Sequence, residues 1–220
     1  MKLSKQTIDV LKNFASINSN LYVKEGSTLL TVSPNKSVLS QATVSESFDQ
    51  EFGIFNLAEF LGVYALFKDP ELEFSEKFVT VKEGKNKVRY AFADSSLLTF
   101  PQKGVKMPEC EVEFTLGEDD LAQIVKASGV ISAPDIEFRG DGSTIKVVLQ
   151  DVSNEYSNQL TVDLDATTDQ EFSVFVKIDN LKVVPGSYNV RISSKKIIEM
   201  KNTATEQTYW VAAEANSVFQ

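Results

Sequence analysis

Apolar and polar residues alternate with a period of two along most of the chain. This period is typical of strands, in which successive side chains point to opposite faces of a sheet. Phenylalanine and valine are frequent in these segments, and turn residues separate them. The pattern predicts a β-rich protein with strands at 21–23, 27–32, 38–44, 78–81, 88–92, 136–138, 145–149, 159–164, 187–192 and 209–213.

Four segments instead place apolar residues three and four positions apart, which is typical of amphipathic helices. The first carries Ile8, Leu11 and Phe14 on one face and has Ser4 as a plausible N-cap. In the second, Asn56 is the cap and Pro70 closes the helix. The predicted helices are 4–17, 56–67, 118–128 and the short 178–184, which Pro185-Gly186 ends.

The helical segments occur in the same order in both halves of the chain. The spacing of Ile8–Leu11 recurs in Leu121–Ile124, and the pattern of 54–60 recurs in 175–181. Each half therefore has one helix near its start and one after its first group of strands. This repetition predicts a duplicated α+β architecture.

Residues 101–108 lie between the two halves, where two prolines bracket a run of polar and small residues. Such a composition is typical of a linker. A chain of 220 residues is also long for one domain and sufficient for two. We predict an N-terminal domain at 1–100, a linker at 101–108 and a C-terminal domain at 109–220.

Positive charge is concentrated at the N-terminus, although the whole chain carries a formal charge of −9. Residues 1–24 contain four lysines against one acid, Asp9, so this stretch is +3 and the remainder must total −12. Three of these lysines, Lys2, Lys5 and Lys12, fall on or beside the first predicted helix. A basic helical face on an acidic protein indicates that one surface meets a polyanion while the others repel it.

The residue counts exclude most familiar catalytic machinery. With no histidine and one cysteine, the chain holds no Ser-His-Asp triad, no Cys-His dyad, no His-ligated zinc and no four-cysteine zinc site. The run 140–142 lies between apolar segments and is predicted as a hairpin turn, because no helix or lysine follows it as in a phosphate-binding loop. Asp119 and Asp120 begin a predicted helix, where carboxylates complement the helix dipole. We expect no catalytic residue, no metal, no cofactor and no enzymatic activity.

The sequence also indicates the cellular compartment in which the protein acts. No stretch approaches the roughly 18 uninterrupted apolar residues that span a bilayer, and the first residues show no apolar signal segment. The single cysteine, Cys110, forms no internal disulfide, and it is predicted as a half-buried strand residue within 109–113. These features favour a cytoplasmic protein without a membrane segment.

Three stretches carry a family resemblance: Met1–Lys5 continuing into Leu11–Ser19, Leu57–Gly62, and Pro185–Tyr188. The length, the order of elements and the central linker agree over the whole chain. In these respects the chain resembles the sliding clamps, or DNA polymerase processivity factors, of T4-type bacteriophages.

This resemblance implies a DNA clamp fold: two similar β-rich domains with helices on one face, assembled as a homotrimeric ring whose helices line the hole. It implies double-stranded DNA, bound without regard to sequence, as a partner, together with the replicative DNA polymerase, an ATP-driven clamp loader and late-transcription factors. It implies the cytoplasm of the infected bacterial host as the location.

The lysines on or beside the predicted helices are the candidates for the DNA-facing wall of such a ring. Three acids, Glu118, Asp119 and Asp120, make the third helix net acidic, so only its later turn is expected to face DNA. The alternative is that the lysines form an ordinary solvated helix face. The candidates are Lys2, Lys5 and Lys12 in the first half, and Lys126, Lys177 and Lys182 in the second.

Partners of sliding clamps typically insert a hydrophobic peptide beneath the linker. Tyr209 and Trp210 alternate with Val211 in a strand pattern, which favours a place in the core. The terminal pair Val218 and Phe219 is either docked or disordered. The candidates for the groove are Phe100, Val105, Met107, Tyr209, Trp210, Val218 and Phe219.

Two other classes of protein fit parts of the sequence. A single-stranded nucleic-acid binder holds its strand with a basic groove and stacking aromatics, and fifteen phenylalanines are available. Most of them, however, occupy alternating positions typical of a core. A β-rich structural or tail protein of a virus fits the composition, but it leaves the N-terminal lysines and the linker without a role.

Overall fold

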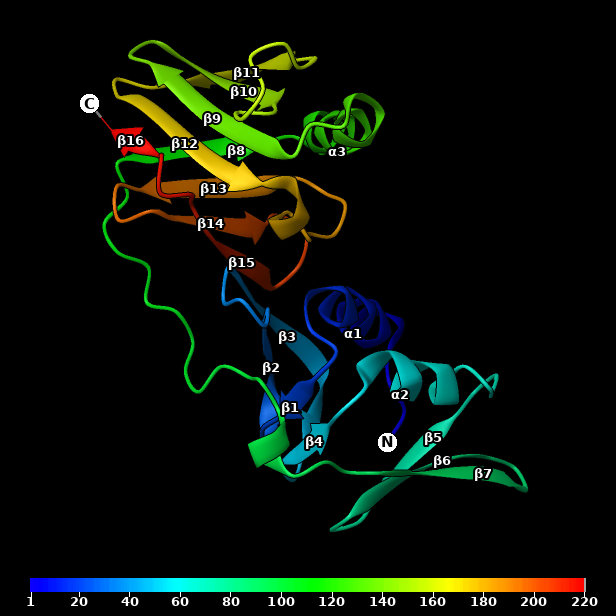
Figure 1. The fold of residues 1–220 in the computed structure, drawn as a ribbon. Coiled ribbons are helices and arrows are strands. Elements are labelled where there is room, and N and C mark those ends of the chain that lie inside the picture. Colours follow the sequence, from blue (N-terminus) through cyan, green and yellow to red (C-terminus); the bar gives the residue numbers. More distant parts are fainter. Residues whose placement is uncertain (220) are drawn as a thin grey trace. The chain divides into compact units, whose positions relative to one another are not determined.

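The computed structural model describes residues 1–219. Contacts divide the chain into two compact units, an N-terminal unit of Met1–Gly104 and a C-terminal unit that begins at Val105. Figure 1 shows helices and antiparallel sheets in both units. Because the two units are separate bodies, each is described by itself.

The N-terminal unit contains two helices, one 3-10 turn and seven strands. Strands β1 and β4 pair with each other, β2 pairs with β3, and β5, β6 and β7 form a three-stranded sheet, all antiparallel. The elements are α1 (Lys5–Ile17), β1 (Leu21–Val23), β2 (Gly26–Val32), β3 (Val38–Phe48), β4 (Phe52–Ile54), α2 (Leu57–Tyr64), β5 (Glu71–Phe74), β6 (Phe78–Glu83), β7 (Asn86–Ala91) and η1 (Ser95–Leu97).

The first predicted helix is confirmed, with its cap. The Ser4 hydroxyl accepts a hydrogen bond from the Thr7 backbone N–H at 3.1 Å, which satisfies one of the unpaired donors of the first turn. Residues spaced three and four apart are buried against α2, β2 and β3. The buried set is Thr7, Val10, Leu11, Phe14 and Ile17.

The second helix begins as predicted but ends earlier than Phe67. The side-chain oxygen of Asn56 caps α2 by accepting from the Glu59 N–H at 3.1 Å. After Tyr64 the N–H groups of Leu66 and Phe67 bond three residues back, at 3.2 and 3.4 Å, in place of the helical four. This tightened turn ends the helix well before Pro70.

Residues 105–219, the described part of the C-terminal unit, contain one helix, one 3-10 turn and nine strands. One sheet has the antiparallel order β11-β10-β9-β12-β16, and in the other β8, β13, β14 and β15 are neighbours in that order. The elements are β8 (Val112–Leu116), α3 (Glu118–Ile131), β9 (Asp135–Asp141), β10 (Thr144–Gln150), β11 (Leu160–Thr167), β12 (Glu171–Lys177), η2 (Ile178–Asn180), β13 (Tyr188–Ser193), β14 (Ile197–Asn202), β15 (Gln207–Ala212) and β16 (Val218–Phe219).

Two predictions for this unit are wrong. The expected helix at 178–184 is only the 3-10 turn η2, after which Leu181 leaves helical geometry with φ −84° and ψ 60°. The β-branched Val183 and Val184 precede Pro185, and the residue before a proline is disfavoured in a helix. Cys110 is half-buried as predicted, but it lies outside a strand, since β8 begins at Val112, and its Sγ donates back to the Pro108 carbonyl at 3.4 Å.

The hairpin predicted at 140–142 is confirmed. Gly140 pairs with Ile145, and Gly142 adopts a φ of +78°, which glycine tolerates without strain. The Asp141 carboxylate accepts from the N–H groups of Ser143 and Thr144 at 3.1 and 2.8 Å, which fixes the turn.

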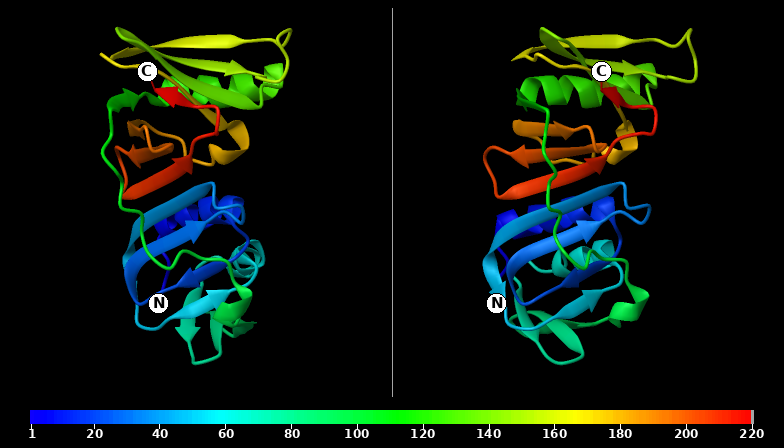
Figure 2. Two further views of the ribbon diagram at one scale, coloured as in Figure 1. Left: turned by 60° about the vertical axis from the view of Figure 1, so that its left-hand side comes forward. Right: turned by 90° about the vertical axis from the view of Figure 1, so that its left-hand side faces the viewer.

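The same order of elements recurs in the two units. From α1 to β7, and again from α3 to β15, the chain forms a helix, four strands, a helical turn and three strands. The preceding segments also match, because Met1 exchanges backbone hydrogen bonds with Leu72 of β5 as β8 does with β13. The difference is at the second helix, which is α2 in the first unit and only η2 in the second. Figure 2 shows α3 lying against the five-stranded sheet of its unit.

Candidate nucleic-acid interface

The exposed face of α1 carries two cations in one line. Lys5 and Lys12 are both exposed, and their separation of seven residues corresponds to two helical turns, or about 10 Å along the axis. Asp9 lies between them and is 3.6 Å from the Lys12 ammonium. The face therefore offers weak positive charge, with Lys12 partly compensated.

The N-terminus of α1 is held by Glu46 on β3. The Glu46 carboxylate accepts hydrogen bonds from the backbone N–H of Ser4 and from the Thr7 hydroxyl. Burial by itself raises the pKa of Glu46, but these hydrogen bonds lower the pKa overall, so the group stays ionised at the positive end of the helix dipole. This anchor fixes the direction in which the α1 lysines point.

Lys2 precedes the helix and is paired with Asp69. The hydrogen bond that the Lys2 ammonium donates to Asp69 raises the pKa of Lys2. Because both side chains are exposed, water screens the pair strongly. Lys2 thus remains a cation beside α1, but one with an acidic neighbour.

Helix α3 is net acidic, as the sequence indicates. Glu118, Asp119 and Asp120 occupy its first turn, where they complement the dipole, and Gly117 provides no side-chain cap. Lys126 lies exposed in the later part of the helix, one position after the exposed Val125.

Lys177 lies on one face of the five-stranded sheet, and the core that α3 covers lies on the other. On β12, Val174 and Val176 are buried, whereas the ammonium of Lys177 bonds to Asp135 of β9 at 2.5 Å. The Asp135 side chain is 2% exposed, and its hydrogen bond raises the pKa of Lys177. Lys177 is therefore the counter-ion of a buried carboxylate. Lys182, after η2, is half-buried.

A second buried carboxylate on the same face escaped the sequence reasoning. Glu137 receives two hydrogen bonds from the Arg139 guanidinium, at 2.8 and 2.7 Å, one from Ser173 at 2.6 Å and one from Gln150 at 2.7 Å. The alternation of charged and apolar residues along β9 places Asp135, Glu137 and Arg139 on one face. The Arg139–Glu137 pair lies within β9, but Ser173, Gln150 and Lys177 come from other strands, which no local pattern indicates.

Phe100 is fixed at the start of the linker. Its ring stacks on the ring of Tyr22. The same segment is also held by the side chains of Asn18, Asn20 and Lys24, which lie on either side of β1. The Asn18 amide donates to the Thr99 carbonyl at 2.7 Å, the Asn20 side-chain oxygen accepts from the Thr99 N–H at 3.2 Å, and the Lys24 ammonium donates to the Gln102 carbonyl at 3.2 Å. Side chains at alternate positions in and on either side of β1 therefore hold residues 99–102.

Tyr209 belongs to the core, which its alternation favoured. Its side chain is completely buried and packs edge-on against Tyr188, with ring centroids 6.1 Å apart. Burial raises the pKa of Tyr188 to about 12. Trp210, on the opposite side of β15, donates its indole N–H to Glu199 at 2.8 Å.

The terminal pair is docked. Val218 and Phe219 form β16, which pairs with Ser173 and Phe172 of β12, and the two phenylalanine rings stack with centroids 5.5 Å apart. Val105 and Met107 are half-buried in a segment without regular structure. Within each unit, the described groove candidates therefore take part in separate contacts and not in one shared cluster.

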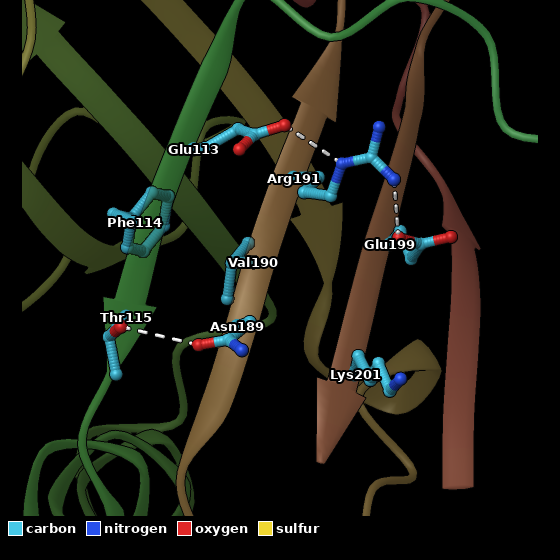
Figure 3. A pocket seen from close by; sticks show the side chains of 8 residues that line it. All are labelled: Glu113, Phe114, Thr115, Asn189, Val190, Arg191, Glu199 and Lys201. Atoms are coloured by element: carbon cyan, nitrogen blue, oxygen red, sulfur yellow. Dashed lines mark hydrogen bonds and ion pairs between the residues drawn. The ribbon is translucent and has the colours of Figure 1, made fainter. Parts of the chain in front are cut away.

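The outer face of β8, β13 and β14 carries a shallow pocket of 430 Å³ (Figure 3). Arg191 crosses it, donating to Glu113 at 2.9 Å and to Glu199 at 3.0 Å. Because two carboxylates flank this guanidinium, it is compensated and offers little attraction for phosphate. In this part of the molecule the structure thus shows paired charges.

Two further features of the described part of the chain concern membranes and metals. None of the helices in residues 1–219 is both long and apolar enough to cross a membrane. The same residues contain no group of three or more cysteine, aspartate or glutamate side chains arranged to hold a metal ion.

Known proteins are similar to this chain in sequence and in fold. Residues 2–100 match the family model described as DNA polymerase processivity factor. The sliding clamp of Vibrio phage KVP40 is 32% identical over 98% of this chain and 100% of its own. The chain belongs to the sliding-clamp family. The sliding clamp of Enterobacteria phage T4 is 27% identical over 99% of this chain and 98% of its own.

Solved structures show the clamp fold. A. fulgidus PCNA, solved with the C-terminal region of FEN-1, has a TM-score of 0.74 at 13% identity and covers 99% of this chain and 98% of its own. The H. pylori β clamp has a TM-score of 0.71 at 12% identity, but this chain spans only 64% of it. The sliding-clamp chain thus has the DNA clamp fold that its sequence predicted.

Proposed function

We propose that three copies of this chain close into a ring around double-stranded DNA and tether the replicative DNA polymerase for processive synthesis. Family membership supports this role. The number of copies rests on the resemblance to phage clamps, and the length is consistent with it, since the chain spans nearly all of the PCNA chain but about two thirds of the β-clamp chain. Three two-unit chains supply as many units as two three-unit chains.

The observation that carries the DNA-binding part is the Lys5–Lys12 face of α1 on an otherwise acidic protein. A ring retains DNA by topology, so its inner wall needs only weak, sequence-independent attraction to phosphate. Lys2, Lys5, Lys12 and Lys126 are the cations that we assign to this wall. Lys182 is a weaker candidate because it is half-buried, and Lys177 is left out because it neutralises Asp135.

We further propose that an ATP-driven clamp loader places the ring on DNA in the cytoplasm of the infected bacterial host. Polymerase peptides, and late-transcription factors, would bind at the linker, where Val105 and Met107 are the apolar residues not engaged in regular structure. The proposed role involves no catalysis by the clamp itself.

Single-strand binding is the alternative, and it requires exposed aromatic side chains. Among the described residues, Phe55 is the phenylalanine with a largely exposed side chain, at 57%. The others pack in the cores or stack on neighbours, as Phe52 does on Phe92. This distribution favours the clamp.

Retention on circular DNA tests the proposal. A loaded ring should stay on a nicked circle during gel filtration and run off when the circle is cut. Light scattering across concentration should give about three times the mass of 24.4 kDa. Tight binding to single-stranded oligonucleotides without a loader, by a chain that stays monomeric, would instead establish the alternative.

A further inference from the structure

A groove of 340 Å³ lies beside helix α3 in the C-terminal unit. One wall is the α3 face that carries Leu121, Ala122 and Val125, and the other wall is the segment 183–185. Leu121 is buried, but 49% of Val125 is exposed. The volume is within the range of protein sites that bind a ligand.

Both walls of the groove are held in place. The Val184 N–H donates to the Tyr209 hydroxyl at 3.2 Å, and the Val184 carbonyl accepts from the Tyr188 hydroxyl at 2.6 Å. The Glu118 N–H donates to the Ser187 hydroxyl at 3.1 Å, which ties the start of α3 to the same segment. The groove is therefore preformed, and an occupant does not bear the cost of ordering it.

The corresponding helix of the N-terminal unit is charged where α3 is apolar. When the spacing of Ile8–Leu11 is aligned with that of Leu121–Ile124, Asp9 corresponds to Ala122. Lys12 then corresponds to Val125. Helix α1 also packs against the eight-residue α2, whereas the element that follows β12 in the second unit is the three-residue turn η2. Helix α3 thus has an apolar face without the neighbouring helix that its counterpart has.

Side chains of opposite charge mark the two ends of the groove. Glu118 lies at one end and Lys126 at the other, and both are exposed. They are separated by about 12 Å along the helix axis. A helix antiparallel to α3 is complementary to this pattern if it has an acid in its first turn and a cation after its last turn. Its own dipole favours the same arrangement.

We propose that this groove binds a helical segment of a partner protein, about two turns long, that lies antiparallel to α3. Apolar residues of the segment, spaced three and four apart, pack against Val125 and the segment 183–185. Its acid lies beside Lys126 and its cation beside Glu118. The inference goes beyond the proposed function, because the binding requires neither the ring nor DNA.

The groove shares no lining residue with the linker. It is therefore a second site, in addition to the one that we propose for polymerase peptides. Lys126, which we assign to the DNA-facing wall, forms one end of it. A docked segment covers this cation, so the segment and DNA phosphate exclude each other at α3.

A labelled peptide of residues 56–68 is the probe, because α2 has the required pattern. It has Glu59 in its first turn and Lys68 after its end. Its apolar residues have the required spacing: Leu57, Phe60, Leu61 and Tyr64. Fluorescence anisotropy measures its binding to the full chain, and chemical shifts of the valine methyl groups locate it. The shifts should change at Val125, Val183 and Val184.

A charge in the apolar wall should prevent docking. Val125→Asp should raise the dissociation constant of the peptide about tenfold or more, because the carboxylate loses water when the groove is filled. Val130→Asp is the matched control, since Val130 is an exposed valine of the same helix that does not line the groove. It should bind the peptide like the wild type. Both positions are exposed, and urea unfolding checks that both variants remain folded.

Exchange of charges tests the orientation. Glu118→Lys should weaken binding of the peptide about two- to fivefold, which is the effect of an exposed ion pair. A peptide with Lys68→Glu should bind the Glu118→Lys variant as the original peptide binds the wild type. Exchange without effect would overturn the antiparallel arrangement.

The outcomes separate this inference from the proposed function. Absence of binding to the wild type at about 1 mM peptide overturns the inference. Equal binding by the wild type and Val125→Asp overturns it as well. A wild-type chain that stays monomeric and is not retained on circular DNA would defeat the proposed ring, but it would leave the peptide measurement unaffected.

Discussion

The ring of Phe100 lies nearly flat against the ring of Tyr22, with centroids 4.4 Å apart and planes 22° apart. Tyr22 is itself held, because its hydroxyl donates to Glu51 at 2.8 Å. The linker therefore leaves the N-terminal unit from a fixed point.

Replacing Phe100 with alanine should loosen the attachment of the start of the linker to the N-terminal unit. The stacked pair contributes about 0.5–1.5 kcal/mol beyond the burial of its surface. We expect faster hydrogen exchange at 99–104 and weaker stimulation of the polymerase, with an unchanged oligomer. Leu97→Ala is a matched control, since that side chain is 65% exposed. Unchanged exchange in Phe100→Ala would show that the hydrogen bonds to Asn18 and Asn20 suffice.

Charges within the linker should affect partner binding and not assembly. Val105→Asp/Met107→Asp places carboxylates where we propose that a hydrophobic peptide docks. Polymerase stimulation should fall by about tenfold or more, because burying an unpaired charge against a peptide is costly. The mass in solution should be that of the wild type. Loss of the oligomer would assign these residues a structural role instead.

Neutralising Lys5 and Lys12 should weaken contact with DNA. For Lys5→Gln/Lys12→Gln we expect weaker loading and a salt dependence shallower by about one to two phosphate contacts. Both positions are exposed, so the free energy of unfolding should change little. The measurement is loader ATPase stimulation by DNA at several salt concentrations. An unaltered salt dependence would remove these lysines from the channel.

Lys177→Met should act on stability and spare DNA retention. Removing the ammonium leaves the Asp135 carboxylate buried, with the Val152 N–H at 3.2 Å as a remaining partner. Breaking one side of such a pair costs about 3–5 kcal/mol. Urea unfolding measures this cost, and Lys177→Arg should restore part of it. A variant that unfolds like the wild type but is lost from DNA would return Lys177 to the channel.

Glu137 should make stability depend on pH in acid. Burial alone raises the pKa of Glu137, but hydrogen bonds from Arg139, Ser173 and Gln150 lower it overall from 4.5. The native state therefore binds this proton less readily than the unfolded chain, so the stabilisation is present above pH 4.5 and is lost as the pH falls below it. Glu137→Gln should cost about 1–3 kcal/mol at pH 7 and less at pH 3 in urea unfolding. A cost independent of pH would contradict the assignment.

Much of the fold could be predicted from local pattern. Ser4 and Asn56 identified two helix starts because a capping side chain acts on N–H groups two or three residues away. The strand at 197–202 was not among the predicted strands, although Ile198 and Met200 are buried in alternation with more exposed residues. The helix expected at 178–184 failed because periodic apolar residues were given more weight than the proline that follows them.

Less of the candidate site could be predicted from the sequence. Helical periodicity suffices to place Lys5 and Lys12 on one face of α1. The role of Lys177 depends on Asp135, 42 residues away and on a neighbouring strand, so charge alone suggested a channel residue. The same limit applies to Arg191, whose flanking carboxylates come from β8 and β14.

Cys110 lies just after the linker, so its thiol can report on changes in the linker. It is the one thiol in the sequence, so a thiol-reactive fluorophore attaches at a single place in each subunit. Burial raises the pKa of this thiol, which slows its reaction at neutral pH. The thiol of Cys110 should react faster when a bound peptide moves the chain away from Pro108. The labelling rate then measures the fraction of clamp subunits with a peptide bound.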